Sequence, residues 1–180
     1  SNYMDFNVYN FALKTINFFT RKAGVPELGG ISHGKISYKV LDGIGKYSSN
    51  LKIKDFKVGN DTLGDLSLFT GNQALTSKQH FKVYVDKGLL DSLNVEGDID
   101  FASKTNNLNL YAKLPPSEIR VFEPFLSGVF KNMKGQIMTK DSLHIRGKFS
   151  DPVVEGEVLV KNADFLVDYL NVPVRFNARI

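Results

Sequence analysis

The chain has 180 residues, and its 23 Lys and Arg against 19 Asp and Glu give a formal net charge of +4. Hydrophobic residues make up 42% and charged residues 23%, a balance that excludes an intrinsically disordered chain. The absence of cysteine excludes a disulfide scaffold, a thiolate metal site and a cysteine nucleophile. No apolar run approaches the roughly 18 residues that a membrane-spanning helix needs.

The main signal along the chain is an alternation of apolar and polar residues with a period of two. It is clear over residues 36–40, 81–85, 108–114 and 143–149, and it continues to Ile180. This period leaves one side of each segment apolar and the other wet, which is typical of antiparallel strands. Turn signals separate the runs at short intervals, among them Asp42-Gly43, Gly59-Asn60-Asp61 and Gly71-Asn72. The pattern predicts a mainly β protein built as an antiparallel meander, with a bulge near Asp55 where the apolar phase slips.

Two stretches break the alternation and predict short helices. Residues 115–128 place Ile119, Phe122 and Leu126 at helical spacing, with Ser117 as the expected cap and Pro124 limiting the length. Residues 12–21 show a similar spacing of apolar residues. Similar strands precede the two helices, and a glycine follows each. This indicates a weak internal repeat of about a hundred residues, with approximate units 5–105 and 106–180. We interpret residues 1–180 as a single β-rich part of a longer repetitive protein, with no separate second domain.

No motif in the chain predicts catalysis. The string G-G-I-S-H-G-K-I at 29–36 nearly matches a phosphate-binding loop, but Ile36 replaces the required hydroxyl residue and a strand follows instead of a helix. The three histidines are scattered without a metal-ligand spacing. Asp98 and Asp100 lie on the polar phase of a strand, which favours solvated charges over an acid–base pair. We therefore expect no enzyme activity, no metal and no cofactor.

The basic excess is mild, and Lys52, Lys54 and Lys57 form its densest run. Nucleic-acid binding usually requires a concentrated basic patch with aromatic residues for stacking, and here the aromatics follow the apolar phase. We expect no nucleic-acid partner. The lysines indicate a solvated face and protected strand edges, and contact with anionic lipid headgroups is the alternative.

The most informative feature is the apolar stripe, the set of alternating apolar residues whose side chains would project from one side of a meander. In a closed sandwich or barrel the stripe is ordinary core, and in an open curled sheet it is a hydrophobic groove. Alternation alone favours ordinary core. Burying each of these apolar side chains is worth about 2 kcal/mol, and side chains left in water would lose much of that free energy and form a large exposed patch. The candidate groove residues are Ile36, Tyr38, Leu51, Ile53, Leu66, Leu68, Phe81, Val83, Val95, Ile99, Leu108, Leu110, Leu143, Ile145, Val158, Val160, Phe165, Val167, Val174 and Phe176.

The last third of the chain resembles a known family. The matching features are a short helix ending in Glu123-Pro124-Phe125-Leu126 with Gly128, then Met133-x-Gly135. The order continues with Leu143-x-Ile145-x-Gly147-x-Phe149, Pro152, Gly156, Asn162-Ala163 and Phe165-x-Val167-Asp168-Tyr169-Leu170-Asn171. In order and spacing these features resemble the TamB-type translocation and assembly modules of the AsmA-like superfamily, at the approach to and the beginning of their C-terminal domain. The earlier part of the chain fits this family more loosely.

This resemblance implies a fold, a location and a function. The fold is an elongated curled antiparallel sheet, a trough often called a β-taco, with one or two short helices and an apolar interior. The location is the periplasm, in a full-length protein held by an inner-membrane anchor that this sequence does not contain. The implied partners are an outer-membrane assembly protein of the BamA type and phospholipid acyl chains. The implied function is non-catalytic phospholipid transfer, outer-membrane protein assembly, or both.

Two other interpretations remain open at this stage. One is a chaperone-like scaffold that pairs its strand edges with strands of outer-membrane proteins. The other is an unrelated closed β-sandwich that binds a ligand such as a sugar. Because both ends of an open sheet would be exposed, an end-to-end dimer is also possible.

Overall fold

The computed structural model describes residues 3–20, 26–41, 44–72, 77–103, 105, 107–126, 128–168 and 172–180. Strands dominate these residues, and the helices are single turns. In chain order the elements are β1 (Tyr3–Ala12), η1 (Leu13–Ile16), α1 (Asn17–Thr20), β2 (Leu28–Leu41), β3 (Ile44–Val58), β4 (Asp61–Asn72), β5 (Lys78–Asp86), η3 (Gly88–Leu90), β6 (Asn94–Asp100), β7 (Leu108–Lys113), β8 (Ser117–Glu118), η4 (Ile119–Phe122), α2 (Glu123–Leu126), β9 (Phe130–Thr139), β10 (Leu143–Lys148), β11 (Asp151–Glu155), β12 (Val158–Val167) and β13 (Val172–Arg179).

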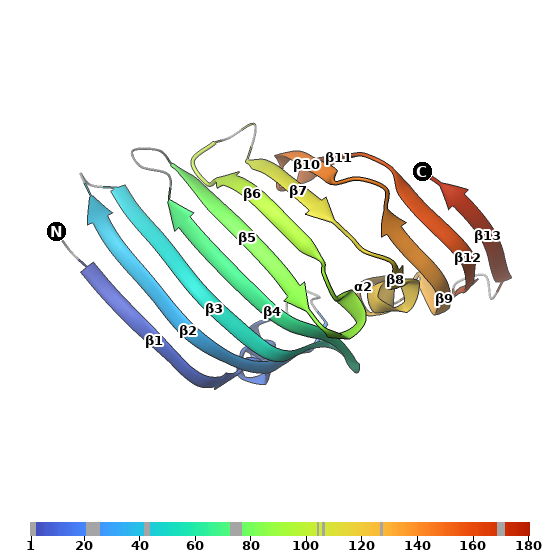
Figure 1. Ribbon diagram of the computed structural model, residues 1–180, viewed down its shortest axis with the longest axis horizontal. Helices are drawn as coiled ribbons and strands as arrows, with labels where there is room; N and C mark the ends of the chain where they lie inside the picture. Colours follow the sequence, from blue (N-terminus) through green and yellow to red (C-terminus); the bar gives the residue numbers. More distant parts are fainter. Residues whose placement is uncertain are drawn as a thin grey trace.

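The strands form two antiparallel sheets that lie side by side in one curved row (Figure 1). The first has nine strands in the order β1-β2-β3-β4-β5-β6-β7-β10-β11, and the second has four in the order β13-β12-β9-β8. β1 and β11 are the two edges of the first sheet and do not pair with each other, so this sheet is open. The predicted mainly β class with an open antiparallel sheet is therefore confirmed.

The two sheets are continuous through their backbones. β7 and β8 follow one line that is interrupted at Pro115 and Pro116, and β9 and β10 form its antiparallel partner. Ala112 pairs with Leu143 on one side of the interruption and Ser117 pairs with Ile137 on the other. Between them the Thr139 N–H donates to the Leu114 carbonyl at 3.0 Å. Because proline has no N–H to donate, the ladder breaks there and the sheet bends without ending.

The two short helical segments use the same device to attach to the next strand. η1 and α1 follow β1, and η4 and α2 follow β8. The first residue of each α turn sends a polar side chain to the backbone of the following strand region. Asn17 bonds both the N–H and the carbonyl of Leu28 at 2.9 Å. Glu123 accepts from the N–H groups of Asn132 and Met133 at 3.2 and 3.1 Å. The similarity suggested by the sequence thus has a structural counterpart at these positions.

A glycine facing a bulge follows each of these attachments. Gly30 lies opposite Asp55, and Gly135 lies opposite Asn162. Asp55 and Asn162 have φ values of 51° and 50°, and the strand register shifts beside both. The bulge expected near Asp55 is therefore confirmed. Such bulges bend the strand and increase the local twist, which accounts for part of the curvature of the row.

Two clusters of close packing lie around η4 and α2, at the end of the strands that is called the lower end below. Val58, Leu63, Val85, Leu90 and Val121 form the first cluster. Ile119, Met133, Val160 and Ala163 form the second. The segment 119–126, called the seam segment below, contributes to both, because Val121 packs in the first cluster and Ile119 in the second. It holds the two sheets together where the backbone ladder is interrupted.

Two local predictions are wrong. Ser117 does not cap a helix; it lies in β8, and its hydroxyl donates to the carbonyl of Pro115 at 2.9 Å. The residues after it begin as a 3-10 turn with no side-chain cap. Gly71 and Asn72 are not a turn but the end of β4. The turn expected at Asp42-Gly43 lies outside the described residues.

We expect Gly135→Ala to lower the free energy of unfolding by at least about 2 kcal/mol, because an L-residue is strained at positive φ. Gly135 has a φ of 113°, and an added Cβ would lie 2.6 Å from the Asn162 carbonyl oxygen. Urea unfolding of the two proteins measures the difference. Gly71→Ala is the matched control, because a Cβ there meets no atom within 4 Å. Equal stabilities of the two variants would contradict the role assigned to Gly135.

Candidate functional site

The strand register places most of the candidate groove residues on one side of the nine-stranded sheet. Directly paired residues of an antiparallel sheet share a face, and Leu51 pairs with Leu68, Leu68 with Val83, and Val83 with Val95. The series continues through Ala112 to Leu143, and Leu110 pairs with Ile145. We call this side the apolar face and the other side the outer face. The groove candidates on it are Ile36, Tyr38, Leu51, Ile53, Leu66, Leu68, Phe81, Val83, Val95, Ile99, Leu108, Leu110, Leu143 and Ile145.

The remaining six candidates lie together on one face of the four-stranded sheet. They are Val158, Val160, Phe165, Val167, Val174 and Phe176, aligned through the pairings of β12 with β13 and β9. The Phe165 ring contacts Phe130 at a centroid distance of 4.8 Å and Phe176 at 5.6 Å. Val158, Val160 and Phe165 pack in the second cluster. Three of the six residues therefore pack in the same cluster as Ile119 of the seam segment.

The apolar face of the first sheet carries no charge above the bulge at Asp55. Among the described residues aligned with Leu51, Leu68 and Leu110 in this part of β1–β7, β10 and β11, none is Asp, Glu, Lys or Arg; below the bulge, Asp61 pairs with the buried Val58. A single charged side chain in contact with hydrocarbon would cost several kcal/mol, so this absence is what an apolar ligand requires.

The apolar face is only partly covered. Of the candidate residues, Leu108 and Val160 are buried, Phe176 is 37% exposed, and all the others are half-buried. The whole chain exposes 11360 Å² of surface. A compact monomer of this mass would expose about 8,700 Å². The excess agrees with a sheet that has one face only partly covered.

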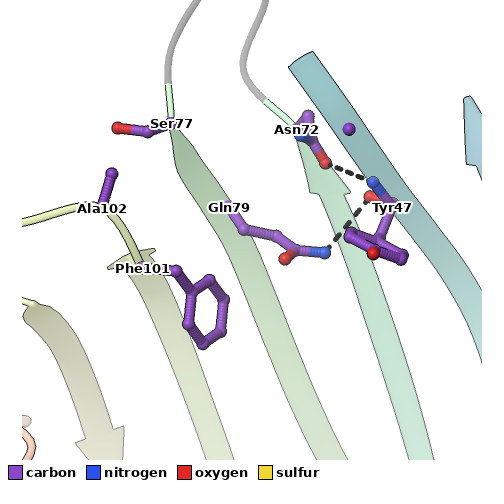
Figure 2. A pocket seen from close by; sticks show the side chains of 7 residues that line it. Tyr47, Asn72, Ser77, Gln79, Phe101 and Ala102 are labelled. Atoms are coloured by element: carbon purple, nitrogen blue, oxygen red, sulfur yellow. Dashed lines mark hydrogen bonds between the residues drawn. The ribbon is translucent and has the colours of Figure 1, made fainter. Parts of the chain in front are cut away.

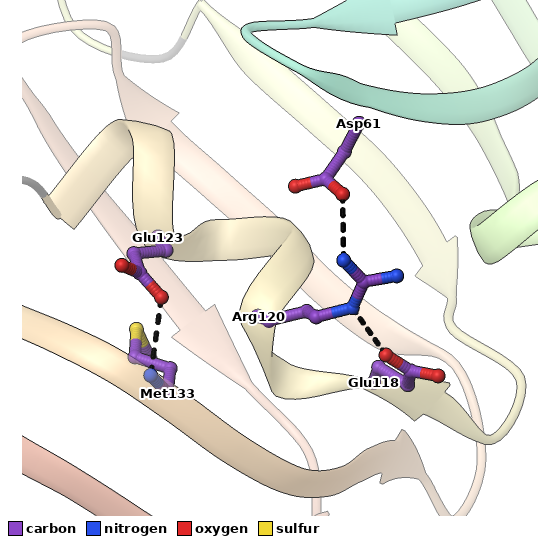
Figure 3. A network of polar contacts seen from close by, with 5 residues as sticks. All are labelled: Asp61, Glu118, Arg120, Glu123 and Met133. Atoms are coloured by element: carbon purple, nitrogen blue, oxygen red, sulfur yellow. Dashed lines mark hydrogen bonds and ion pairs between the residues drawn. The ribbon is translucent and has the colours of Figure 1, made fainter.

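The seam segment closes the lower end with a polar contact as well as apolar packing (Figure 3). Arg120 Nη1 lies 2.9 Å from Asp61 Oδ1, across to the β3–β4 hairpin, and Arg120 also pairs with Glu118. These carboxylates raise the pKa of Arg120, with Glu118 as the main cause. Glu123 of the same segment holds the Met133 N–H. The seam segment is thereby attached to both sheets by polar contacts.

The upper end of the apolar face is different, because polar side chains interrupt the apolar stripe there. Ser49 and Thr70 share a hydrogen bond at 3.0 Å. One row higher, the Asn72 side chain accepts from the Tyr47 N–H at 3.0 Å, and Gln79 Nε2 donates to the Tyr47 carbonyl at 3.2 Å. Tyr47, Asn72 and Gln79 border a hollow of about 500 Å³, called the upper hollow below (Figure 2). Its lining residues are Gly45, Tyr47, Asn72, Ser77, Gln79, Phe101 and Ala102.

Sequence reasoning missed this polar row. The groove candidates were chosen as apolar residues in phase with the stripe, so Ser49, Thr70, Asn72 and Gln79 were passed over although they have the same phase. The available signal was a polar residue at an apolar-phase position of two adjacent predicted strands. Gln79 differs from an ordinary surface amide, because the residue is only 9% exposed.

The outer face carries the charges, which pair across neighbouring strands. Lys82 contacts Glu96 at 3.1 Å, and His80 contacts Asp98 at 3.0 Å. Asp100 accepts from the Ser77 hydroxyl at 2.8 Å, so Asp98 and Asp100 each make a separate structural contact. Within the described part of the chain, no group of three or more His, Asp or Glu side chains is arranged to hold a metal ion. Ion pairs this exposed contribute little to stability, and their value is to keep this face wet.

None of the helices in the described ranges is long and apolar enough to cross a membrane. Comparisons of the chain with protein-family models, with curated proteins and with solved structures gave no match. The function is therefore argued from the geometry of the apolar face and from the resemblance stated above.

The edge strand β1 provides a prediction of pH dependence. Lys35, Ser37 and Tyr3 all bond the Asp5 carboxylate, and the Lys35 bond is the main reason that the pKa of Asp5 is lowered from 3.8 to about 2. Because the folded pKa lies below the ordinary one, these contacts are fully present above about pH 4 and are lost as the pH falls towards 2.

We expect carboxyl NMR to show a titration midpoint of Asp5 near 2 that rises in Lys35→Gln. Lys82→Gln, which removes a cation two strands beyond β3, should leave it unchanged. A wild-type midpoint near 3.8 would contradict the prediction.

Proposed function

We propose that this chain is a non-catalytic lipid-conducting segment, in which the apolar face holds acyl chains and the charged outer face stays in water. The observation that carries the proposal is a sheet face that carries no charge above the bulge at Asp55 and whose apolar side chains are mostly half-buried. An apolar ligand on that face would replace water against half-buried side chains, each worth on the order of 1 kcal/mol when covered. No reacting group is needed for such a role.

The resemblance to TamB-type proteins supports a wider setting for this role. In that setting the chain is part of a periplasmic bridge between the inner and outer membranes that transfers phospholipid. Its partner would be an outer-membrane assembly protein of the BamA type. These points rest on the resemblance alone and extend the proposal drawn from the geometry.

A second candidate function is a scaffold that pairs with strands of outer-membrane proteins. The observation in its favour is the free edge at β1, which runs for ten residues, Tyr3–Ala12, without a Lys, Arg or Pro to discourage pairing. Backbone hydrogen bonds would provide the affinity in that case, and the apolar face would be incidental. The two candidates differ in what a charge on the apolar face should do.

We expect Val95→Asp or Ile145→Asp to reduce the phospholipid that copurifies with the protein by at least about tenfold, because the new carboxylate must lie against hydrocarbon. Mass spectrometry of material extracted from the purified proteins measures the loss. Asn109→Asp is the matched control: it adds the same charge to the outer face and keeps an acceptor for His144, which lies 2.8 Å from Asn109.

Circular dichroism should show that the three variants keep the β-sheet signal of the wild type. Undiminished lipid in a folded Val95→Asp protein would contradict the conducting role. If that variant also kept its binding to outer-membrane protein strands, the scaffold function would be favoured.

A further inference from the structure

Positive charge is concentrated on the outer face of β1–β3, the strands at one end of the row (Figure 1). These strands hold six lysines against Asp5 and Asp55. Their excess equals the formal net charge of the whole chain, +4, so the 17 basic and 17 acidic residues elsewhere cancel (23 less 6, and 19 less 2). The register and the bulge at Asp55 place all six on the outer face, and we call them the lysine strip: Lys35, Lys39, Lys46, Lys52, Lys54 and Lys57.

The lysine strip is less neutralised than the strands that follow it. On β5 the lysine of the outer face contacts a glutamate of β6 at 3.1 Å. In the strip, Lys35 pairs with Asp5, whereas within the described ranges Lys39, Lys46 and Lys52 take part in no ion pair. Lys39 and Lys46 lie directly opposite each other across β2 and β3. Like charges in that position destabilise a sheet, and a bound anion would reduce their repulsion.

A hollow of about 420 Å³ lies on this face and is called the basic hollow below. All of its polar side chains can donate hydrogen bonds, and none is a carboxylate. His33 Nδ1 accepts from the Asn10 N–H at 3.4 Å, which leaves Nε2 of the same ring as a donor. The basic hollow is therefore built for an anionic group. It is lined by Asn7, Val8, Tyr9, His33, Gly34, Lys35, Asn50 and Lys52.

The uncharged residues of the strip narrow the class of anion. The amides of Asn7 and Asn50 suit the hydroxyl groups of a sugar, and Tyr9, which is 77% exposed, offers an aromatic ring against which a sugar ring can pack. Between the lysines, the outer positions of β2 and β3 hold only Ser37, Ser48 and Asn50. A segment that binds a membrane surface places large apolar side chains beside its lysines. A single-stranded nucleic acid needs a series of aromatic rings for its successive bases.

We propose that the lysine strip binds an acidic polysaccharide, a chain of sugar units that carry carboxylate, sulfate or phosphate groups. One unit occupies the basic hollow, where the lysine and histidine side chains bind its anionic group and the two amides bind its hydroxyls. The polysaccharide continues along β2 and β3 to Lys39 and Lys46. Lys46 is six residues from Lys52, which is about 20 Å along the strand and long enough for several sugar units. This role uses only the outer face and goes beyond the function proposed for the apolar face.

Binding of four labelled probes to the wild type and to two variants tests the proposal. The probes are a heparin-derived octasaccharide, uncharged maltooctaose, single-stranded DNA of the same total charge as the octasaccharide, and phosphatidylglycerol vesicles. The wild type should bind the octasaccharide most tightly and should not bind maltooctaose. Lys46→Gln combined with Lys52→Gln should weaken octasaccharide binding about tenfold at low salt and less at high salt. Asn50→Val, which removes an uncharged donor, should weaken it about threefold at every salt concentration.

The control is Lys113→Gln combined with Lys148→Gln, which removes the same charge from exposed positions of β7 and β10. An equal loss of octasaccharide binding in this control would overturn the assignment to the lysine strip. Unchanged binding in Asn50→Val would overturn the assignment of a sugar unit to the basic hollow. A wild type that prefers DNA or vesicles, or that binds no probe, would overturn the proposal as a whole. Each of these results leaves the function of the apolar face standing, because none of the exchanged side chains lies on that face.

Discussion

The structure depends on an antiparallel backbone ladder, continuous from β1 to β7, that holds an apolar face in place without a second layer. Each strand from β1 to β7 pairs with its neighbour in the chain, so the sheet is maintained by hydrogen bonds between consecutive segments. Side-chain packing is concentrated in the two clusters joined by the seam segment. This division separates the part that stabilises the chain from the part that is available to a ligand.

Repeated devices at intervals of roughly a hundred residues keep this arrangement regular. Asn17 and Glu123 fasten a helical turn to the next strand region, and Gly30 and Gly135 admit a bulge on the neighbouring strand. Each copy bends the sheet and places a helical segment at its lower end. Units that pack only on their neighbours produce extended shapes, and a lengthwise apolar face follows from them without further elements.

The fold could be predicted from the sequence because a period of two assigns each residue to a face. Once Leu51, Leu68 and Val83 are in phase, antiparallel pairing brings them to one side. The packing of Val58, Leu63 and Val121 was not predicted, because bulges and the seam segment break the period where they lie. Ser117 was misassigned as a cap because its hydroxyl binds the Pro115 carbonyl instead. The upper hollow could not be predicted, since it depends on side chains that cross from one strand to the next.

The absence of native cysteine allows a direct test of whether the apolar face is uncovered. Single cysteines at Leu68 and Leu110, both half-buried on that face, would be compared with one at Asn109 on the outer face and one at the buried Val121. A water-soluble maleimide should modify Leu68→Cys and Leu110→Cys within about tenfold of the rate at Asn109→Cys, because the thiolate needs only solvent access to react. Added phospholipid should protect the first two positions and not the third. If both react as slowly as Val121→Cys in delipidated protein, a second layer covers the face and the account is wrong.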